Sequence, residues 1–437
     1  MFPTWNSVAI IALSQLCPTV TPAQIPLLPQ SHTEGYKFDA LLHLPGISPY
    51  FDAIGSGLDH SAPRHCEVTA ASYLVRHTAI YANDDDYERY IEPFLKKLNT
   101  TYGAISGKKR KGWKGSLSFF DKWENPINDP DNQLEQITPQ GIKDSKKVGK
   151  HLLSRYPKLV PTTKKIYADK KSRTKDTAAA FVQVFPQNVE VEEILLNRSS
   201  FHAQDPHKAC KAFSKEPGNE EQGQFMSKYT IPIIKRLQKH SPVELEQTDI
   251  MGLQQLCGYE SAINGKKSDI CDVFTDDEWM AYEYAWDLKY SRMFHAPRHT
   301  DSNIPDDDGQ RFFLAFTHRE VPPFIATALG LFNSSNAYAE EFPTDRINWS
   351  RSWKMAELIP FLGHVGIEKL TCNAVSIDPK DDMEYIRIIA NSALRPILSC
   401  ADGPGASCNF DQFTEIVRRG MEIYGDFDGV CKNNEDD

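Results

Sequence analysis

Two strongly apolar segments of this chain each lead into a turn that carries a histidine, and this pattern constrains the fold more than any other feature. Residues 70–75 lead into His77, and residues 312–316 lead into His318. Helical patterns separate such strands, and strands that alternate with helices predict an α/β layer with a largely parallel sheet. Ligands bind such sheets beyond the carboxyl ends of the strands. We therefore expect both histidines to face one crevice.

The same pattern predicts how the chain is divided. Residues 24–186 and 305–437 alternate strands and helices, and they predict one large three-layer α/β domain with a mainly parallel central sheet. Residues 187–304 are mostly helical in pattern and predict a smaller inserted helical domain. A length of 437 residues suits one large or two modest domains.

The charge balance excludes several classes of partner. Asp and Glu number 59 against 49 Lys and Arg, so the formal net charge is −10. General nucleic-acid binding needs a basic face, and attachment to an anionic membrane needs a basic cluster. After the N-terminus no stretch approaches the roughly 20 apolar residues of a membrane span, so no stable membrane insertion is expected. The composition indicates an acidic, folded protein, and we expect an enzyme with a small anionic or organic substrate.

The first 23 residues are read as a signal peptide. Residues 8–13 form a short apolar core, and Thr21-Pro22-Ala23 offers a small-residue cleavage site. No Lys or Arg precedes the apolar core, which departs from the usual pattern, and a buried N-terminal strand or helix is the alternative. The prediction is that the mature chain is secreted.

Cysteines and glycosylation motifs agree with an extracellular chain. Cleavage after Ala23 removes Cys17 and leaves eight cysteines, an even number that suggests disulfides in a secreted protein, with free buried thiols as the alternative. A zinc site is not expected, because no two cysteines have CxxC spacing. Four N-x-[ST] motifs predict glycosylation, at Asn99, Asn197, Asn333 and Asn348.

Several motifs together resemble the histidine acid phosphatase family, especially its secreted fungal phytase branch. The segment from Cys66 to His77 is similar to the family's first strand and its R-H-G-x-R-x-P motif. Ser172-Arg173 resembles the segment with a further phosphate-binding arginine, and Thr317-His318 resembles the H-D segment. The segment 134–141 is similar to the L-T-P-x-G helix start. The resemblance implies a histidine acid phosphatase, or phosphoglycerate mutase-like, fold.

The resemblance also implies a site and a mechanism. His77 would attack phosphorus and form a phosphohistidine, while Arg76, Arg173 and His318 would supply positive charge to the phosphate. No metal or other cofactor is implied, because the arginines take the place of metal ions in this chemistry. The implied disulfide pairs are Cys66–Cys372, Cys210–Cys431, Cys257–Cys271 and Cys400–Cys408.

The catalytic motifs depart from the family's pattern at specific positions. Thr78, Ile80 and Ala82 replace the motif's glycine, second arginine and proline, and Arg319 replaces the aspartate of the H-D pair. Loss of one preorganised donor typically costs about 10²–10³ in rate. Arg319 is a candidate replacement for phosphate binding, with exposure to solvent or pairing to an acid as the alternative. Glu320, one position later, is the candidate proton donor, as in the family's H-A-E branch.

These departures keep further functions open. The first is a secreted, phytase-like phosphomonoesterase. The second is a repurposed enzyme on the same fold, an acid/base isomerase, cyclase or dehydratase of a fungal biosynthetic pathway, with His77 and Glu320 as base and acid. The third is a non-catalytic binding or secreted structural protein, or a catalytically weakened homologue. No pattern in the chain predicts its oligomeric state.

Overall fold

The computed structural model of this chain describes seven ranges and three further residues. These are 37–55, 57–101, 112–194, 206–295, 309–334, 336–373 and 383–424, with Asp426, Gly429 and Cys431. The predicted signal peptide at residues 1–23 and the glycosylation motif at Asn197 lie outside the described residues.

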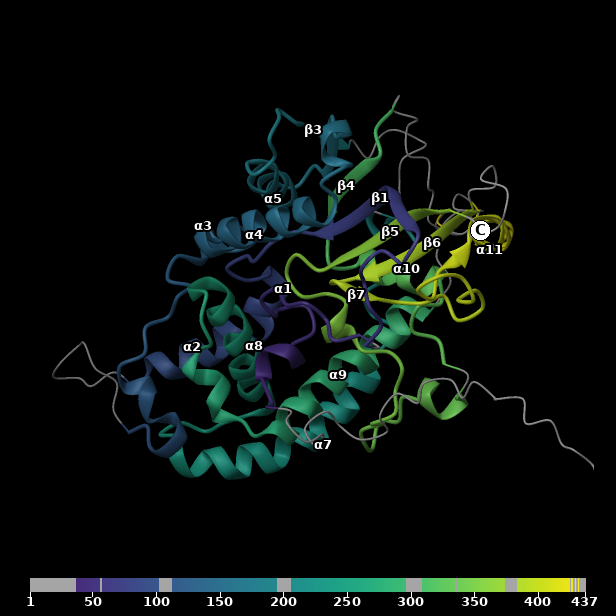
Figure 1. Cartoon of the computed structure of the whole chain (residues 1–437). Helices are drawn as coiled ribbons and strands as arrows, with labels where there is room; N and C mark the ends of the chain where they lie inside the picture. Colours follow the sequence, from purple (N-terminus) through teal and green to yellow (C-terminus); the bar gives the residue numbers. More distant parts are fainter. Residues whose placement is uncertain are drawn as a thin grey trace, which may run out of the picture.

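A mixed eight-stranded sheet forms the centre of the α/β part (Figure 1). The strand order is β3-β2-β4-β1-β5-β6-β7, and β8 pairs with β6. The pairs β3–β2, β2–β4 and β4–β1 are parallel, whereas the pairs from β1–β5 onward are antiparallel. The strands are β1 (Cys66–Arg76), β2 (Lys165–Asp169), β3 (Glu190–Ile194), β4 (Phe312–Thr317), β5 (His364–Cys372), β6 (Met383–Ala390), β7 (Ala393–Leu394) and β8 (Cys408–Asn409).

The register of the parallel strands brings three carboxyl ends together. Arg76 of β1 lies beside Thr317 of β4, and Ala168 of β2 lies beside Phe316 of β4. Val75 and Phe316 are fully buried, as expected for central strands that are covered on both faces. The turns after β1, β2 and β4 therefore start at one edge of the sheet.

Two helices cover one face of the sheet, α4 (Pro139–Arg155) and α5 (Ser172–Val182) (Figure 1). The predicted start of α4 is confirmed, because the Thr138 side chain accepts a hydrogen bond from the backbone N–H of Gly141. Apolar side chains of α4 and α5 share one core with the inner face of β1, β2 and β4. The helix α10 (Val321–Ala328) directly follows the turn after β4 and packs against β1 and β5.

A helical part lies on the other side of the sheet and contains α7 (Asn219–Leu237), α8 (Gln247–Asn264) and α9 (Asp276–His295) (Figure 1). These helices share an apolar core with α2 (Glu92–Asn99), which precedes the predicted insertion. Conversely, β3 falls inside the predicted insertion but pairs with β2 in the sheet. The predicted boundary at residue 187 is therefore too early, and helical packing also draws on the N-terminal segment.

The remaining elements are short helices and the C-terminal helix. They are α1 (Asp84–Asp86), the π-helix Tyr87–Ile91, α3 (Pro130–Gln133), α6 (Pro206–Ala209) and α11 (Phe410–Tyr424), with 3₁₀ helices at Ala40–His43, Gly115–Asp121, Val160–Thr162, Gln238–His240, Asp269–Val273, Ala337–Glu340 and Met355–Glu357. Within the described ranges, no helix combines the length and the apolar character that a membrane span requires.

All four implied disulfides are present in the structure. Cys66–Cys372 joins the first residue of β1 to the last residue of β5, which lie opposite each other in the antiparallel register. Cys257–Cys271 joins α8 to the 3₁₀ helix Asp269–Val273 that follows it. The other two bonds are Cys210–Cys431 and Cys400–Cys408.

The described glycosylation motifs differ in exposure. Asn99 and Asn333 are exposed, as an acceptor must be. Asn348 is fully buried, and its side-chain amide donates to the carbonyl oxygens of Tyr338 at 2.6 Å and Glu341 at 2.9 Å. The structure argues against the predicted glycan at Asn348, because the side-chain nitrogen that would carry the glycan is hydrogen-bonded to two carbonyl oxygens and has no access to solvent.

Candidate active site

The two histidines meet at the shared edge of the sheet. The ring centroids of His77 and His318 lie 5.9 Å apart in an edge-on arrangement, and both residues are buried. The backbone N–H of His77 donates to the carbonyl oxygen of Thr317 at 2.8 Å, which extends the β1–β4 ladder by one residue. The expectation that two strand ends bring these imidazoles together is confirmed.

His77 is held as a neutral imidazole with a defined tautomer. Its Nδ1 lies 2.8 Å from the carbonyl oxygen of Thr78, and since a carbonyl oxygen only accepts, Nδ1 carries the proton. Burial, followed by the positive charges of Arg76 and Arg173, lowers the pKa of His77 well below its ordinary value. The Nε2 lone pair is therefore available to attack an electrophile over a wide pH range.

Arg76 is a buried cation with an unused donor. Its Nη1 donates to the carbonyl oxygen of Ile359 at 2.7 Å, and its guanidinium lies 4.5 Å from the centroid of the Phe361 ring. Among the described residues, its Nε has no hydrogen-bond partner. Burial and the nearby Arg319 lower the pKa of Arg76 to about 9, so it keeps its charge at acidic and neutral pH.

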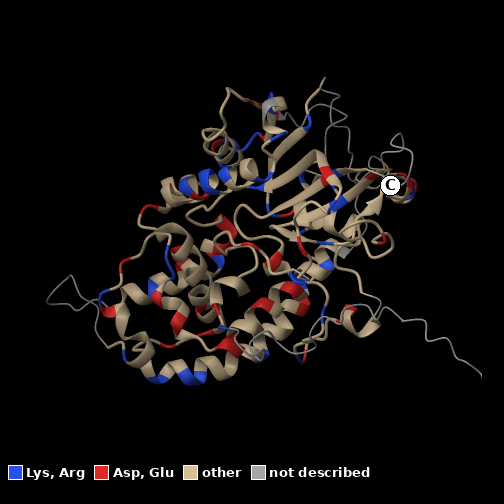
Figure 2. Cartoon of the chain, viewed as in Figure 1, with Lys and Arg blue, Asp and Glu red and all other residues tan. Residues whose placement is uncertain are grey.

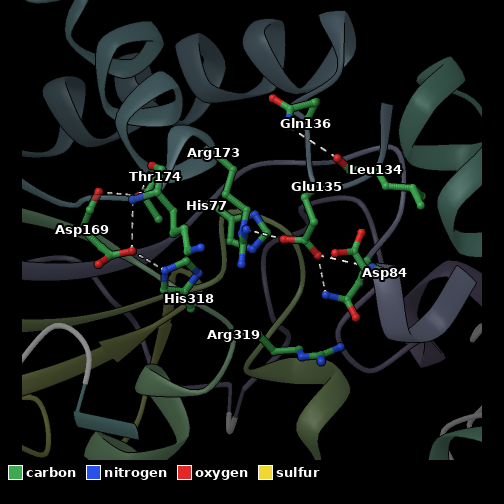
Figure 3. A network of polar contacts seen from close by, with 12 residues as sticks. His77, Asp84, Leu134, Glu135, Gln136, Asp169, Arg173, Thr174, His318 and Arg319 are labelled. Carbon is green, nitrogen blue, oxygen red and sulfur yellow. Dashed lines mark hydrogen bonds and ion pairs between the residues drawn. The ribbon is translucent and has the colours of Figure 1, made fainter. Parts of the chain in front are cut away.

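Arg173 lies in the first turn of α5 and forms an ion pair with Glu135 (Figure 3). Figure 3 shows the guanidinium of Arg173 between His77 and the Glu135 carboxylate. Both side chains of the pair are mostly buried, and the Nε of Arg173 has no hydrogen-bond partner among the described residues. Sequence reasoning identified Arg173 but missed Glu135.

His318 contacts two groups that were also missed from the sequence. Its Nε2 lies 2.5 Å from Oδ2 of Asp169 and 2.7 Å from Nζ of Lys208, and Lys208 lies 3.2 Å from the same Asp169 oxygen. Burial lowers the pKa of His318, the hydrogen bond to Asp169 opposes this effect, and the charge of Lys208 adds to it. Asp169 is the last residue of β2, and His77 is the first residue after β1. The argument from strand ends could therefore have identified Asp169 as well.

Glu320 is a buried carboxylate with two cations and a histidine around it at the start of α10. Its carboxylate oxygens lie 3.8 Å from Nε2 of His207, 3.4 Å from Nζ of Lys215 and 4.0 Å from Nε of Arg319. Burial alone raises the pKa of Glu320, but the neighbouring positive groups outweigh it and hold the pKa well below its ordinary value. Glu320 is therefore ionised when the site contains no anion.

Arg319 is directed to an acid of α1. Its Nη1 lies 3.8 Å from Oδ2 of Asp86, a buried carboxylate that also accepts a hydrogen bond from the Tyr259 hydroxyl at 2.6 Å. Figure 3 shows the Arg319 side chain extending away from His318. This geometry favours the pairing alternative over direct contact with a phosphate at His77.

The altered motif positions belong to the packing around the site. The Thr78 hydroxyl donates to the carbonyl oxygen of Gly141 at 2.8 Å and thereby ties the turn to α4. Ile80 is 2% exposed, forms a bridge with Ile137 and joins the apolar core of the helical part. Ala82 is fully buried in the same core.

In the described part of the chain, no group of three or more His, Cys, Asp or Glu side chains could hold a metal ion.

Two histidines and nearby arginines lie at the ends of parallel strands in a mixed sheet that is flanked by helices. This is the architecture of histidine acid phosphatase-like hydrolases. The chain belongs to the histidine phosphatase superfamily (branch 2), whose sequence model matches residues 67–300, more than half of the chain.

Individual relatives and structures agree with this family. The phytase PHO112 of Candida albicans is 25% identical, over 90% of this chain and 87% of its own. The repressible acid phosphatase of Saccharomyces cerevisiae is 27% identical, over 91% of this chain and 87% of its own. The crystal structure of the phytase from D. castellii has a TM-score of 0.74 and 20% identity and covers 93% of each chain, which shows the shared fold.

Proposed function

We propose that the protein is a secreted acid phosphomonoesterase that acts through a phosphohistidine at His77. The observation that carries this proposal is the buried, neutral imidazole of His77, whose Nδ1 is bound to a carbonyl oxygen while two arginines and a second histidine surround the ring. A nucleophile for phosphorus needs a free lone pair, and the charge of the transferred group needs fixed cations.

The reaction proceeds in two displacements. Nε2 of His77 forms a bond to phosphorus while the ester P–O bond breaks and the alcohol leaves with a proton. Water then attacks the phosphohistidine, the P–N bond breaks, and orthophosphate and the free imidazole are released. Arg76 and Arg173 stabilise the charge on the equatorial oxygens through donors that are already in place, and His318 adds positive charge when its ring is protonated.

Glu320 supplies the proton to the leaving alcohol in this proposal. The cations around it keep it ionised in the free enzyme, and a bound phosphate shares those cations. The attraction that lowers the pKa of Glu320 thus weakens when substrate binds, and the pKa rises toward the range in which a carboxyl group acts as an acid. The resting pKa is therefore compatible with an acid role in the complex.

Secretion is supported by the disulfides. Four disulfides account for all eight cysteines that remain after the predicted cleavage. Disulfides persist in oxidising compartments and are rare in the cytosol. Together with the apolar N-terminal segment, they favour an extracellular protein.

A second candidate function is a repurposed acid/base enzyme on the same fold. It is favoured by the two ion pairs Arg173–Glu135 and Arg319–Asp86, which engage arginines with carboxylates, and by the apolar Ile80 at the motif's second arginine position. In that function His77 and Glu320 act as base and acid on an organic substrate.

A phosphate-release assay separates the two candidates. The protein is incubated with p-nitrophenyl phosphate near pH 5, beside the variant His77→Ala and the control His60→Ala, which changes an exposed histidine. The phosphatase proposal expects release by the natural chain and by the control, and a loss of about 10³ or more in His77→Ala. No release by the natural chain, or equal release by His77→Ala, contradicts it and leaves the acid/base function.

A further inference from the structure

The exposed face of α4 carries a row of lysines. Lys143, Lys147 and Lys150 occupy positions i, i+4 and i+7 of this helix, so they lie on one side of it and span about 10 Å along its axis. All three are exposed, and Lys146 beside them is half-buried. The apolar face of α4 packs into the core against the sheet, so the lysine row faces away from the sheet. Figure 2 shows the basic residues along α4.

Neighbouring acids do not neutralise this row. In the described part of the chain, none of the four lysines takes part in an ion pair, whereas Lys158, shortly after the helix, pairs with Glu67. The helix contains five basic residues and one acidic residue, Asp144, which is half-buried and accepts a hydrogen bond from Gln140. A chain with a net charge of −10 therefore carries a local excess of positive charge on this helix.

A polar pocket lies at the C-terminal end of the same helix. Its volume is about 310 Å³, and its lining includes His151, Ser154 and Arg155 of α4 together with Arg387 of β6. Ser154 comes four residues after Lys150, so the lysine row leads along the helix to the pocket. A pocket of this size holds a small molecule or one residue of a longer chain.

The pocket is built around a buried carboxylate that two arginines share. Glu368 is fully buried, and its Oε1 accepts hydrogen bonds from Arg155 at 2.8 and 2.9 Å, while its Oε2 accepts from Arg387 at 2.6 and 2.9 Å. Two guanidinium groups against one carboxylate leave one positive charge. Among the described residues, no hydrogen bond or ion pair uses Nη1 of Arg155. This nitrogen is therefore available to donate to an anionic ligand.

The remaining groups indicate which polyanion fits. His60, Ser61, His151 and Ser154 line the pocket with donors and acceptors that match the hydroxyl groups of a sugar. Nucleic-acid bases stack on aromatic rings, and α4 contains no Phe, Tyr or Trp. A helix that lies in a membrane interface needs a free apolar face, and that of α4 is already packed against the sheet. An acidic sugar chain matches both the lysine row and the pocket.

We propose that the lysine row of α4 and the pocket at Arg155 form a binding surface for an acidic polysaccharide. The lysines bind successive anionic groups of the sugar chain, and the pocket holds one sugar residue with its anionic group at Nη1 of Arg155. The surface lies outside the catalytic residues, so the proposal does not depend on phosphate hydrolysis at His77.

Binding to immobilised polygalacturonate at low salt tests the lysine row. One variant replaces the exposed lysines of the row with glutamine, at Lys143, Lys147 and Lys150. The matched control removes the same charge from three exposed lysines of α7 and the turn after it, on the far side of the molecule from α4 (Figure 1), at Lys228, Lys235 and Lys239. Thermal melting verifies that both variants are folded.

A further variant tests the pocket without changing any charge. Ala62 is exposed and lines the pocket, so Ala62→Trp adds a bulky side chain to its wall and leaves both arginines in place.

The expected result is a loss of affinity that depends on where the charge is removed. The row variant binds polygalacturonate about tenfold or more weakly than the natural chain does, because three attractive charges are lost. The α7 control stays within about threefold of the natural chain, and Ala62→Trp binds about threefold or more weakly. Binding by the natural chain weakens as sodium chloride is added, since salt screens exposed charges.

Four outcomes overturn the proposal. These are no binding of polygalacturonate by the natural chain, an equal loss in the row variant and the α7 control, equally tight binding of polyglutamate at the same carboxylate concentration, and equally tight binding of phosphatidylserine vesicles. An unchanged affinity in Ala62→Trp contradicts the role of the pocket. None of these measurements involves phosphate release, so a failure of the proposed phosphatase function leaves them unchanged.

Discussion

The ring centroids of His77 and His318 lie 5.9 Å apart, although the two residues are far apart in the sequence. They come together because the strands that precede them, β1 and β4, pair in parallel. The ladder continues one residue past β1, through the hydrogen bond from His77 to Thr317. Two residues on one backbone ladder move little relative to each other, so the separation is set by the sheet and not by flexible loops. This rigidity is what a nucleophile and a charge-stabilising partner require.

Glu320→Gln removes the proposed proton donor while it keeps the shape of the side chain. An alkyl leaving group needs a proton, so we expect hydrolysis of an alkyl phosphate to fall by about 10²–10³. A p-nitrophenolate leaving group needs no proton, so hydrolysis of p-nitrophenyl phosphate falls far less. Steady-state kinetics on both substrates measure the difference. An equal loss on both substrates would show that Glu320 only balances charge.

Lys208→Met removes the cation that contacts the ring of His318. Because the charge of Lys208 lowers the pKa of His318 and the Asp169 carboxylate opposes it, the pKa of His318 rises in this variant. An NMR titration of the ring protons measures the shift, and Lys211→Met, which changes an exposed lysine three residues away, is the control. An unchanged or lower pKa in Lys208→Met would mean that the lysine does not act on the ring.

The sequence was sufficient to predict the strand ends, since apolar runs that lead into His77 and His318 follow from local pattern alone. It was also sufficient for an α/β fold with a parallel sheet, which β3, β2, β4 and β1 form, whereas the antiparallel strands from β5 onward were not predicted. The disulfide pairs came only from the family resemblance, because eight cysteines permit many connectivities. The strand β3 was missed, since three of its five residues are glutamates and it lacks the long apolar run of a central strand.

Glu135 and Lys208 could not be found from local pattern for a different reason. Glu135 lies in the segment between α3 and α4, and Lys208 lies in the short helix α6. Each reaches the site only because distant elements pack together, as the contacts Glu135–Arg173 and Lys208–His318 show. Ile80 illustrates the opposite case. Its position in the motif suggests a crevice residue, whereas its burial in the helical core shows that packing determines the residue type there.

Ile80→Ala tests that reading of the motif. Removal of three carbon atoms from a fully packed site leaves a cavity, and we expect the free energy of unfolding to fall by about 2–4 kcal/mol. Ile231→Ala, at a position that is 62% exposed, changes the free energy by about 0.5 kcal/mol or less. Urea denaturation measures both values. A cost for Ile80→Ala as small as that of the control would place Ile80 in open space.

A buried acidic pair predicts how stability depends on pH. Asp287 and Glu283 share Arg351, which lies 2.7 Å from Asp287 and 3.3 Å from Glu283. Burial, opposed by Arg351 and reinforced by Glu283, raises the pKa of Asp287 to about 7. The unfolded chain releases this proton near pH 4 and the folded chain near pH 7. The folded state therefore binds more protons in between, and stability falls as the pH rises.

Asp287→Asn removes this titration without a large change in shape. The melting temperature of the natural chain should fall between pH 5 and pH 7, and that of Asp287→Asn should fall less over the same interval. Differential scanning calorimetry at several pH values measures both slopes. Identical slopes in the two proteins would show that Asp287 is ionised throughout the interval.

The covalent intermediate is the most direct test of the mechanism. The natural chain and His77→Ala are mixed rapidly with a phosphomonoester that carries a radiolabelled phosphate, and each is denatured in alkaline detergent, in which a phosphorus–nitrogen bond survives. We expect label on the natural chain within one turnover and none on His77→Ala. Label that persists in His77→Ala, or a natural chain that turns over substrate without acquiring label, would contradict nucleophilic attack by His77.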